Sequence, residues 1–274
     1  MTPFYNVIFR ACDKVESVHK AKRPFGLNKK QIIKVCFFSI YKSISKFNAR
    51  FVVIGDELSD EILNFFKLFK NVEVINEKFG DASGSLIKQL DIARTIPDDQ
   101  WVYLCEDDYL HSPSCFEYVS EFIINSRNYV QTSHKKKNYL NYMIGNLEKV
   151  PIIIHTADYP DRYEPAWKRP SYIFLSRFCH WRQITNTTHT VLLQSKTFKK
   201  FEKDFRLSAI GPSDSKLSQK IYGRFNFKGK SLCLSPIHGL STHMTEGVMT
   251  PLVDWDSIHL ELIEEIKSQG VWFD

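Results

Sequence analysis

Three acidic residues in succession, Glu106-Asp107-Asp108, follow the apolar run Trp101-Val102-Tyr103-Leu104-Cys105. Carboxylates placed this close repel one another and raise one another's pKa. A divalent cation removes that conflict, and Mg²⁺ or Mn²⁺ prefers oxygen ligands and bridges to phosphate oxygens. The triplet therefore predicts a site for a divalent cation and a diphosphate. A solvated turn or a helix cap is the alternative interpretation.

Two more polar residues stand directly after apolar runs. Arg10 follows Tyr5-Asn6-Val7-Ile8-Phe9, and Asp56 follows Phe51-Val52-Val53-Ile54-Gly55. In sheets of parallel strands, ligands bind at the carboxyl ends of the strands. We therefore expect Arg10, Asp56 and the acidic triplet to face one crevice. Surface salt bridges explain these two residues equally well.

Short apolar runs alternate with helical patterns through the first 125 residues. The expected strands cover 5–9, 51–54, 72–75 and 101–105, with helical apolar stripes between them and from 113 onward. Further strands are expected at 152–154, 191–193 and 232–234, and helices at 196–205, 213–222 and 255–268. This order predicts an α/β fold with a mostly parallel sheet and helices on both faces. We expect residues 1–125 and residues 126–274 to form two halves of one domain, the second of them less regular.

Composition narrows the class of protein. The chain has 274 residues, 43% of them hydrophobic, with a formal net charge of +6. That length suits one large domain. No apolar run approaches a membrane span and no secretion signal precedes the first expected strand, so we expect a cytoplasmic protein that touches a membrane, if at all, peripherally. The six cysteines lack C-x-x-C spacing, which argues against a zinc site and favours small buried thiols in a reducing compartment.

The run from Trp101 to Phe116, WVYLCEDDYLHSPSCF, resembles the DxD motif segment of GT-A-fold glycosyltransferases, particularly the family-2-like inverting enzymes. Upstream, Gly80-Asp81-Ala82-Ser83-Gly84-Ser85 is similar to that family's glycine-rich loop. Downstream, His189 to Lys199 resembles the strand before the acceptor helix. Ser213-Asp214 occupies the position of the "ED" catalytic base, and Leu234-Ser235-Pro236 with His238 and His243 resembles the last strand and its metal-ligand histidine.

This resemblance implies a metal-dependent glycosyltransferase that moves one sugar from a nucleotide-sugar, first of all a UDP-sugar, to a glycan or lipid-linked acceptor with inversion. Residues 1–125 would be its nucleotide-sugar-binding half and residues 126–274 its acceptor-binding half. Arg10 and Asp56, at the ends of the first two expected strands, would hold the nucleotide base and ribose. Asp108 would be the direct ligand of manganese or magnesium. Glu106 would contact the ribose or a metal-bound water, or bind the metal itself, and Asp107 would contact the sugar or the metal. His243 is the preferred histidine ligand, with His238 second. Ser83 and Ser85 would hydrogen-bond the nucleotide or cap the helix that follows them.

Asp214 is the expected general base, which would take the proton of the acceptor hydroxyl. A helix-capping aspartate is the alternative, and Asp158 and Asp161 are rival bases. The family's first acid of the "ED" pair is replaced by Ser213, and the Q-x-x-R-W motif of processive members is absent, which favours transfer of a single sugar. The aromatic residues expected either to line the acceptor site or to pack in the core are Tyr163, Trp167, Tyr172 and Trp181.

Two other functions compete with this interpretation. A nucleotidyltransferase also places acids and Mg²⁺ on a parallel sheet, but its Gly-rich, basic signature after the first strand is missing from Phe9-Arg10-Ala11-Cys12-Asp13. The positive charge and scattered aromatic residues also suit a nucleic-acid-binding protein, although no recognisable binding module is present.

Overall fold

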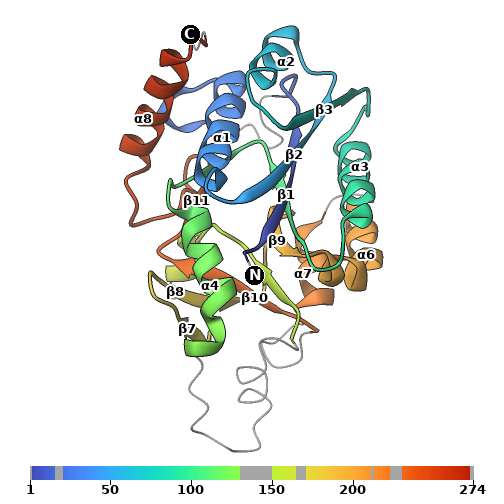
Figure 1. Cartoon of the computed structure of the whole chain (residues 1–274), viewed down its shortest axis with the longest axis vertical. Helices are drawn as coiled ribbons and strands as arrows, with labels where there is room; N and C mark the ends of the chain where they lie inside the picture. The colour runs from blue at the N-terminus through green and yellow to red at the C-terminus, as the bar shows by residue number, and fades with distance from the viewer. Residues whose placement is uncertain are drawn as a thin grey trace, which may run out of the picture.

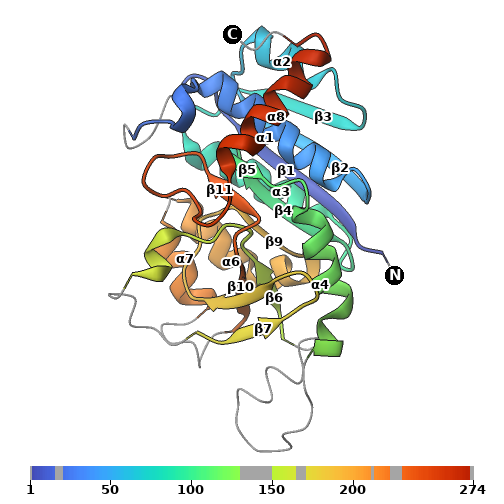
Figure 2. The same cartoon turned by 90° about the vertical axis from the view of Figure 1, so that its left-hand side faces the viewer.

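The computed structural model describes residues 2–15, 21–129, 150–164, 171–210, 213–222 and 230–271. Within these ranges the chain forms one nine-stranded sheet, a two-stranded sheet and helices packed on both faces of the larger sheet (Figures 1 and 2). Trp167 and residues 130–149 lie outside the described residues, so the predicted boundary near 126–150 and that part of the predicted acceptor wall are not seen.

The large sheet has the strand order β3-β2-β1-β4-β9-β6-β10-β8-β7. In that order the strands are Val72–Glu77, Asn48–Asp56, Phe4–Ala11, Trp101–Glu106, Val191–Gln194, Ile152–Ile154, Leu232–Ile237, His180–Ile184 and Ile173–Leu175. β3, β2, β1 and β4 run parallel, β9 runs antiparallel to both of its neighbours, and β10 runs parallel to β6. The predicted α/β class with a mostly parallel sheet is confirmed, and the sheet continues from the first half of the chain into the second.

The helices form two layers. α1 (Lys29–Ile44), α2 (Asp60–Phe66), α4 (Cys115–Tyr129) and α8 (Trp255–Ser268) contribute to the core on one face of the sheet. α3 (Ala82–Thr95), α6 (Ser195–Ala209) and α7 (Asp214–Ile221) cover the other face. In Figure 1, α1, α4 and α8 stand on one side of the strands and α3 and α6 on the other. The short 3₁₀ helices η1 (Pro24–Gly26) and η2 (Pro160–Tyr163) lie in connections.

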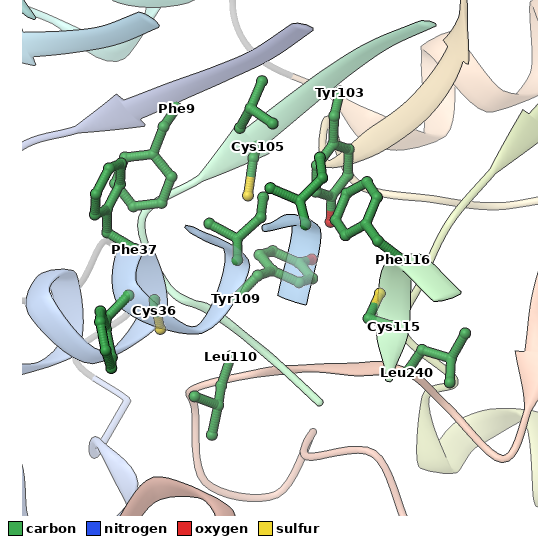
Figure 3. Close-up of a cluster of buried hydrophobic side chains, with 14 of the residues drawn as sticks. Phe9, Cys36, Phe37, Tyr103, Cys105, Tyr109, Leu110, Cys115, Phe116 and Leu240 are labelled. Atoms are coloured by element: carbon green, nitrogen blue, oxygen red, sulfur yellow. The ribbon is translucent and has the colours of Figure 1, made fainter. Parts of the chain in front are cut away.

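Both faces of β1 are buried because the strand lies between the two helical layers. Phe9 packs with the α1 layer and Ile8 with the α3 layer, as the alternation of side chains along a strand requires. Figure 3 shows Phe9 facing Phe37 of α1, and the ring centroids are 5.4 Å apart in an edge-to-face arrangement. This rigid centre holds the carboxyl ends of β1 and β4 in place.

Four strands of the described residues, β5 (Tyr109–His111), β7, β8 and β11 (Ser241–His243), escaped prediction because they are short or carry polar residues. β8 and β7 lie within the segment 155–190 that was expected to be irregular, and β5 pairs antiparallel with β11 just beyond the acidic triplet. β8 reads His-Trp-Arg-Gln-Ile, and its polar residues Arg182 and Gln183 are buried by partners from distant segments. Local hydrophobic alternation therefore gives no signal there.

Ser59 stands at the N-cap of α2 but makes no capping bond, because its hydroxyl and amide both bind Asp13. The predicted cap of the following helix, α3, by Ser83 or Ser85 is corrected. α3 is capped by Asp81, whose carboxylate accepts from Gly84 N at 2.8 Å, so Ser83 and Ser85 lie inside the first turn and do not cap it.

No helix of the described ranges combines the length and the apolar character that a membrane span requires. The six cysteines are free, and five of them are buried, as the sequence predicts.

Candidate active site

The acidic triplet lies at the carboxyl end of β4, in the turn that leads into β5. β5 pairs with β11 so that His243 is opposite Tyr109, and Met244 N donates to the carbonyl oxygen of Asp108 at 2.8 Å. This pairing brings His243, 135 positions downstream, to the triplet, because the β5–β11 ladder places the start of β5 beside the end of β11. The predicted meeting of His243 with the triplet is therefore present in the fold.

Glu106 is held by the neighbouring strands on both sides. Arg10 lies opposite Glu106 in the β1–β4 ladder, and its Nη2 donates to Glu106 Oε1 at 2.7 Å. On the other side Thr190, which precedes β9, donates from Oγ1 to Glu106 Oε2 at 3.2 Å. The predicted proximity of Arg10 and the triplet thus takes the form of an ion pair. Both oxygens of Glu106 already have partners.

Asp107 connects the end of β4 to the start of α1. Its Oδ2 accepts from Cys12 N at 2.9 Å, and its Oδ1 accepts from Lys29 Nζ at 2.5 Å. The Lys29 side chain is only 7% exposed. Burial alone would lower the pKa of Lys29, but the nearby carboxylates of Asp107 and Asp108 raise it, so the ammonium is retained. These contacts give Asp107 a structural role.

Asp108 contacts two basic side chains through a single carboxylate oxygen, Oδ2. His243 Nε2 and Arg23 Nη1 both lie 3.1 Å from Asp108 Oδ2. Burial opposes the charge of the Asp108 carboxylate, but His243, Lys29 and Arg23 outweigh it and lower its pKa well below the ordinary value. The pKa of His243 is raised, because Asp108 and then Glu106 overcome the effect of its burial. Arg23 also donates to Met244 O at 3.0 Å, which fixes its head beside the pair.

Aromatic and hydroxyl groups line the side of the triplet that faces the second half of the chain. The Tyr109 ring stacks on His243 with centroids 5.1 Å apart and an interplanar angle of 12°. The Tyr109 hydroxyl hydrogen-bonds to Thr188 Oγ1 at 2.8 Å and to the Tyr159 hydroxyl. Stacking and hydroxyl contacts together restrict the orientation of the imidazole beside Asp108.

The other predicted nucleotide contacts serve local structure. Asp56 follows β2 as expected, but its Oδ1 accepts from Phe79 N at 2.9 Å and orders the connection after β3. Ser85 is buried and its hydroxyl donates to Ala82 O, whereas Ser83 is partly exposed. Their roles as nucleotide contacts stay predictions.

Asp214 is the first residue of α7 and its side chain is 44% exposed. Its Oδ1 lies 2.8 Å from Nδ1 of His189, which stands one residue before Thr190. The rival Asp158 is 1% exposed and bound by Arg162, Arg182 and the hydroxyl of Tyr163, so it has no access to a substrate.

Other candidates lie outside this arrangement. Asp161 is exposed on η2 and His238 is exposed after β10, and neither contacts the triplet in the described structure. Trp181 is completely buried, packs on Phe122 at 4.6 Å and donates from Nε1 to Ser176, so its core role is confirmed and it cannot stack on a sugar. Tyr163 is 44% exposed with the guanidinium of Arg182 over its ring, which leaves it available on the surface.

Sequence reasoning missed three residues that contact the triplet directly: Arg23, Lys29 and Thr190. For Lys29 a signal existed. A lysine at the first position of a helix opposes the helix dipole, so its placement there calls for a compensating carboxylate. Arg23 and Thr190 gave no comparable signal, because each reaches the triplet only through the tertiary fold.

Asp108 and His243 are the two side chains whose geometry could accommodate a divalent cation, and their role as metal ligands stays a prediction. Within the described residues no three His, Cys, Asp or Glu side chains are grouped as a metal site. Mg²⁺ and Mn²⁺ sites in nucleotide-binding proteins use one or two protein ligands and take the remainder from phosphates and water. The convergence of Asp108 Oδ2 and His243 Nε2 on one another fits that requirement. Glu106 as a metal ligand stays a prediction.

No protein-family model and no curated protein matches the chain. Among solved structures, the galactosyltransferase LgtC in complex with donor and acceptor sugar analogues is 12% identical over 83% of this chain and 72% of its own, with a TM-score of 0.42. S. aureus TarS, residues 1–349, is 11% identical over 97% of this chain and 65% of its own, with a TM-score of 0.49. The 4-diphosphocytidyl-2C-methyl-D-erythritol synthase of Anaerococcus prevotii is 8% identical over 97% and 96%, with a TM-score of 0.43. These similarities concern the fold. The function proposed for this chain rests on the geometry of the site.

Proposed function

We propose that this chain is a glycosyltransferase that uses a divalent cation to bind a nucleoside-diphosphate sugar and transfers the sugar to an acceptor hydroxyl. The observation that carries the proposal is the meeting of Asp108 with His243 at the carboxyl ends of the parallel strands, among Arg10, Arg23 and Lys29. These residues come from five separate segments, and their charges are concentrated at the strand ends where ligands bind in sheets of parallel strands.

The charges of the site favour joint binding of a cation and a diphosphate. Three carboxylates face two guanidinium groups and one ammonium, so these charges nearly cancel before His243 is counted. A diphosphate alone adds negative charge beside Asp108, and a divalent cation alone adds positive charge beside Arg23. Together they leave the balance almost unchanged. We therefore expect each to strengthen the binding of the other.

Asp108 and His243 would hold the cation, which would neutralise the charge that develops on the nucleoside diphosphate as it leaves. Asp214 would act as general base. The acceptor oxygen forms a bond to the anomeric carbon, its proton passes to the Asp214 carboxylate, and the bond from the anomeric carbon to the phosphate oxygen breaks with its electron pair. Attack opposite the leaving group inverts the anomeric centre.

A nucleotide-sugar panel with Mn²⁺ or EDTA tests this function, with UDP-glucose, UDP-galactose, UDP-N-acetylglucosamine and GDP-mannose as donors. We expect one donor to be hydrolysed slowly in Mn²⁺ and not in EDTA, with release of the nucleoside diphosphate. Asp108→Asn should abolish this release. Asp98→Asn is the matched control, because Asp98 is 68% exposed and pairs only with Lys199 in the described structure.

The products separate this function from nucleotidyl transfer, which would instead release pyrophosphate from a nucleoside triphosphate. If no donor is consumed in a metal-dependent way, or if Asp108→Asn behaves as Asp98→Asn does, the proposed function is wrong.

A further inference from the structure

The segment from Thr187 to Thr190, just before β9, contacts different parts of the protein with alternate residues. The hydroxyl of Thr188 bonds to Tyr109, and the hydroxyl of Thr190 donates to Glu106. Both of these contacts reach the strand end that carries the acidic triplet. The segment is anchored there by even-numbered residues.

The odd-numbered residues of the same segment reach α6 and α7. Thr187 hydrogen-bonds through its amide to Ser218 Oγ at 3.1 Å and through its hydroxyl to Tyr222 at 3.2 Å. His189 contacts Asp214 at the start of α7. This four-residue segment therefore contacts both the strand end that carries the acidic triplet and the helix that carries Asp214.

His189 makes one contact with each ring nitrogen. Nδ1 lies 2.8 Å from Asp214 Oδ1, and Nε2 lies 3.1 Å from Ser208 Oγ at the end of α6. Serine, histidine and aspartate in this order also form hydrolase triads. Here the Ser208 residue is only 3% exposed and its hydroxyl donates to Phe205 O at 2.7 Å, so it has no access to a substrate. The imidazole is itself 5% exposed and held from both sides.

Asp214 differs from its partner in exposure. Its side chain is 44% exposed, whereas that of His189 is buried. One carboxylate oxygen is taken by the imidazole, and Oδ2 makes no hydrogen bond within the described ranges. A carboxylate at an exposed helix start would otherwise rotate freely. With Oδ1 fixed, Oδ2 keeps one direction and remains able to accept a proton.

We propose that His189 is a positioning residue that orients Asp214 by donating from Nδ1 to Oδ1, so that Oδ2 takes the proton of the attacking hydroxyl. This rests on the proposed function, in which Asp214 is the general base. The Thr187–Thr190 segment then sets the base relative to the triplet, because the same four residues contact both.

Two substitutions at one position separate the two contacts of the imidazole. His189→Asn places an amide nitrogen near the position of Nδ1, so it keeps the donor to Asp214 and loses the Ser208 contact. His189→Gln places its amide near Nε2, so it keeps the Ser208 contact and loses the donor to Asp214. Ser208→Ala removes the second contact alone and serves as the control.

Steady-state release of UDP from the UDP-sugar found in the panel is the readout, and water takes the place of the acceptor. We expect His189→Gln to lower kcat by about 10- to 100-fold with the KM for the donor unchanged, as for other residues that orient a reacting group. His189→Asn and Ser208→Ala should stay within about threefold of the wild-type kcat, well short of that loss. Asp214→Asn should lower kcat by about 10²- to 10⁴-fold.

Equal losses in His189→Gln and His189→Asn, or no loss in either, would overturn the positioning role. If Asp214→Asn retains full turnover, the base assignment in the proposed function fails, and the positioning role fails with it. If Asp214→Asn loses turnover and His189→Gln does not, only the positioning role is wrong. The Mn²⁺-dependent thermal shift with UDP is measured for every variant, and it should be unchanged in all of them because none touches Asp108 or His243.

Discussion

Replacing Lys29 by methionine leaves the Asp107 carboxylate buried with the Cys12 amide as its remaining donor among the contacts described for it. The Lys29 and Asp107 side chains are 7% and 10% exposed. Removing one partner of a buried ion pair costs about 3–5 kcal/mol, because the other charge stays buried without compensation. Since Asp107 keeps the Cys12 bond at 2.9 Å, we expect the lower end, about 3 kcal/mol.

The double variant Lys29→Met/Asp107→Asn removes both charges, while the asparagine oxygen can still accept from Cys12. We expect Asp107→Asn alone to cost about 2 kcal/mol and the double variant no more than about 2 kcal/mol, because no unpaired charge remains. The coupling between the two positions is then about 3 kcal/mol. Urea unfolding followed by circular dichroism measures these differences as shifts of the midpoint at an unchanged m value.

Lys88→Met is the control, because Lys88 and Glu77 form an ion pair at 2.9 Å with side chains 33% and 49% exposed. Such surface pairs contribute about 0–1 kcal/mol. Additive effects at Lys29 and Asp107, each no larger than that of Lys88→Met, would refute the structural role of the pair. The double variant should also retain Mn²⁺-dependent UDP binding, which distinguishes Asp107 from Asp108.

Two further predictions concern stability. Burial lowers the pKa of His111 to about 3 from 6.5, and burial together with the charge of Arg162 lowers that of His155 to about 3. Between about pH 3 and pH 6.5, these two histidines bind protons in the unfolded chain but not in the folded one. The free energy of unfolding therefore falls with decreasing pH by about 1.4 kcal/mol per pH unit for each histidine. His111→Gln should reduce the slope of unfolding free energy against pH, measured from pH 4.5 to 6, by about that amount; an unchanged slope would contradict the burial argument. Gly239→Ala would place a methyl group 2.3 Å from Thr250 Cγ2 and 2.9 Å from the Asp158 backbone nitrogen, and should destabilise the protein by about 1–3 kcal/mol in urea unfolding. A wild-type midpoint would show that this turn has room to relax.

Hydrophobic periodicity was sufficient to predict the central strands of the large sheet and most helices, but not β7 and β8 at one edge of the sheet. The runs at 5–9, 51–54 and 101–105 are apolar on both faces because each strand lies between two helical layers, and such strands have a strong local signal. The triplet could be predicted as a site for the same reason. Acids directly after a buried strand have to lie at a strand end, whatever the rest of the fold does.

The partners of the triplet could not be predicted from local patterns. Arg23 and Thr190 reach Asp108 and Glu106 from segments 85 and 84 residues away along the chain. The sequence marks neither as unusual, since an arginine in a basic stretch and a threonine before a strand are ordinary on any surface. Trp181 shows the opposite problem. Its neighbours are polar, but partners from α4 and the second half bury it completely.

The central claim is that Asp108 and His243 bind a divalent cation together with a nucleoside diphosphate. A calorimetric titration of UDP into the protein with Mn²⁺ and with EDTA tests it most directly. We predict that Mn²⁺ strengthens UDP binding by at least about tenfold, which is about 1.4 kcal/mol, and that Asp108→Asn and His243→Ala remove this gain. Equal UDP affinity in Mn²⁺ and in EDTA, or an undiminished gain in both variants, would contradict the account.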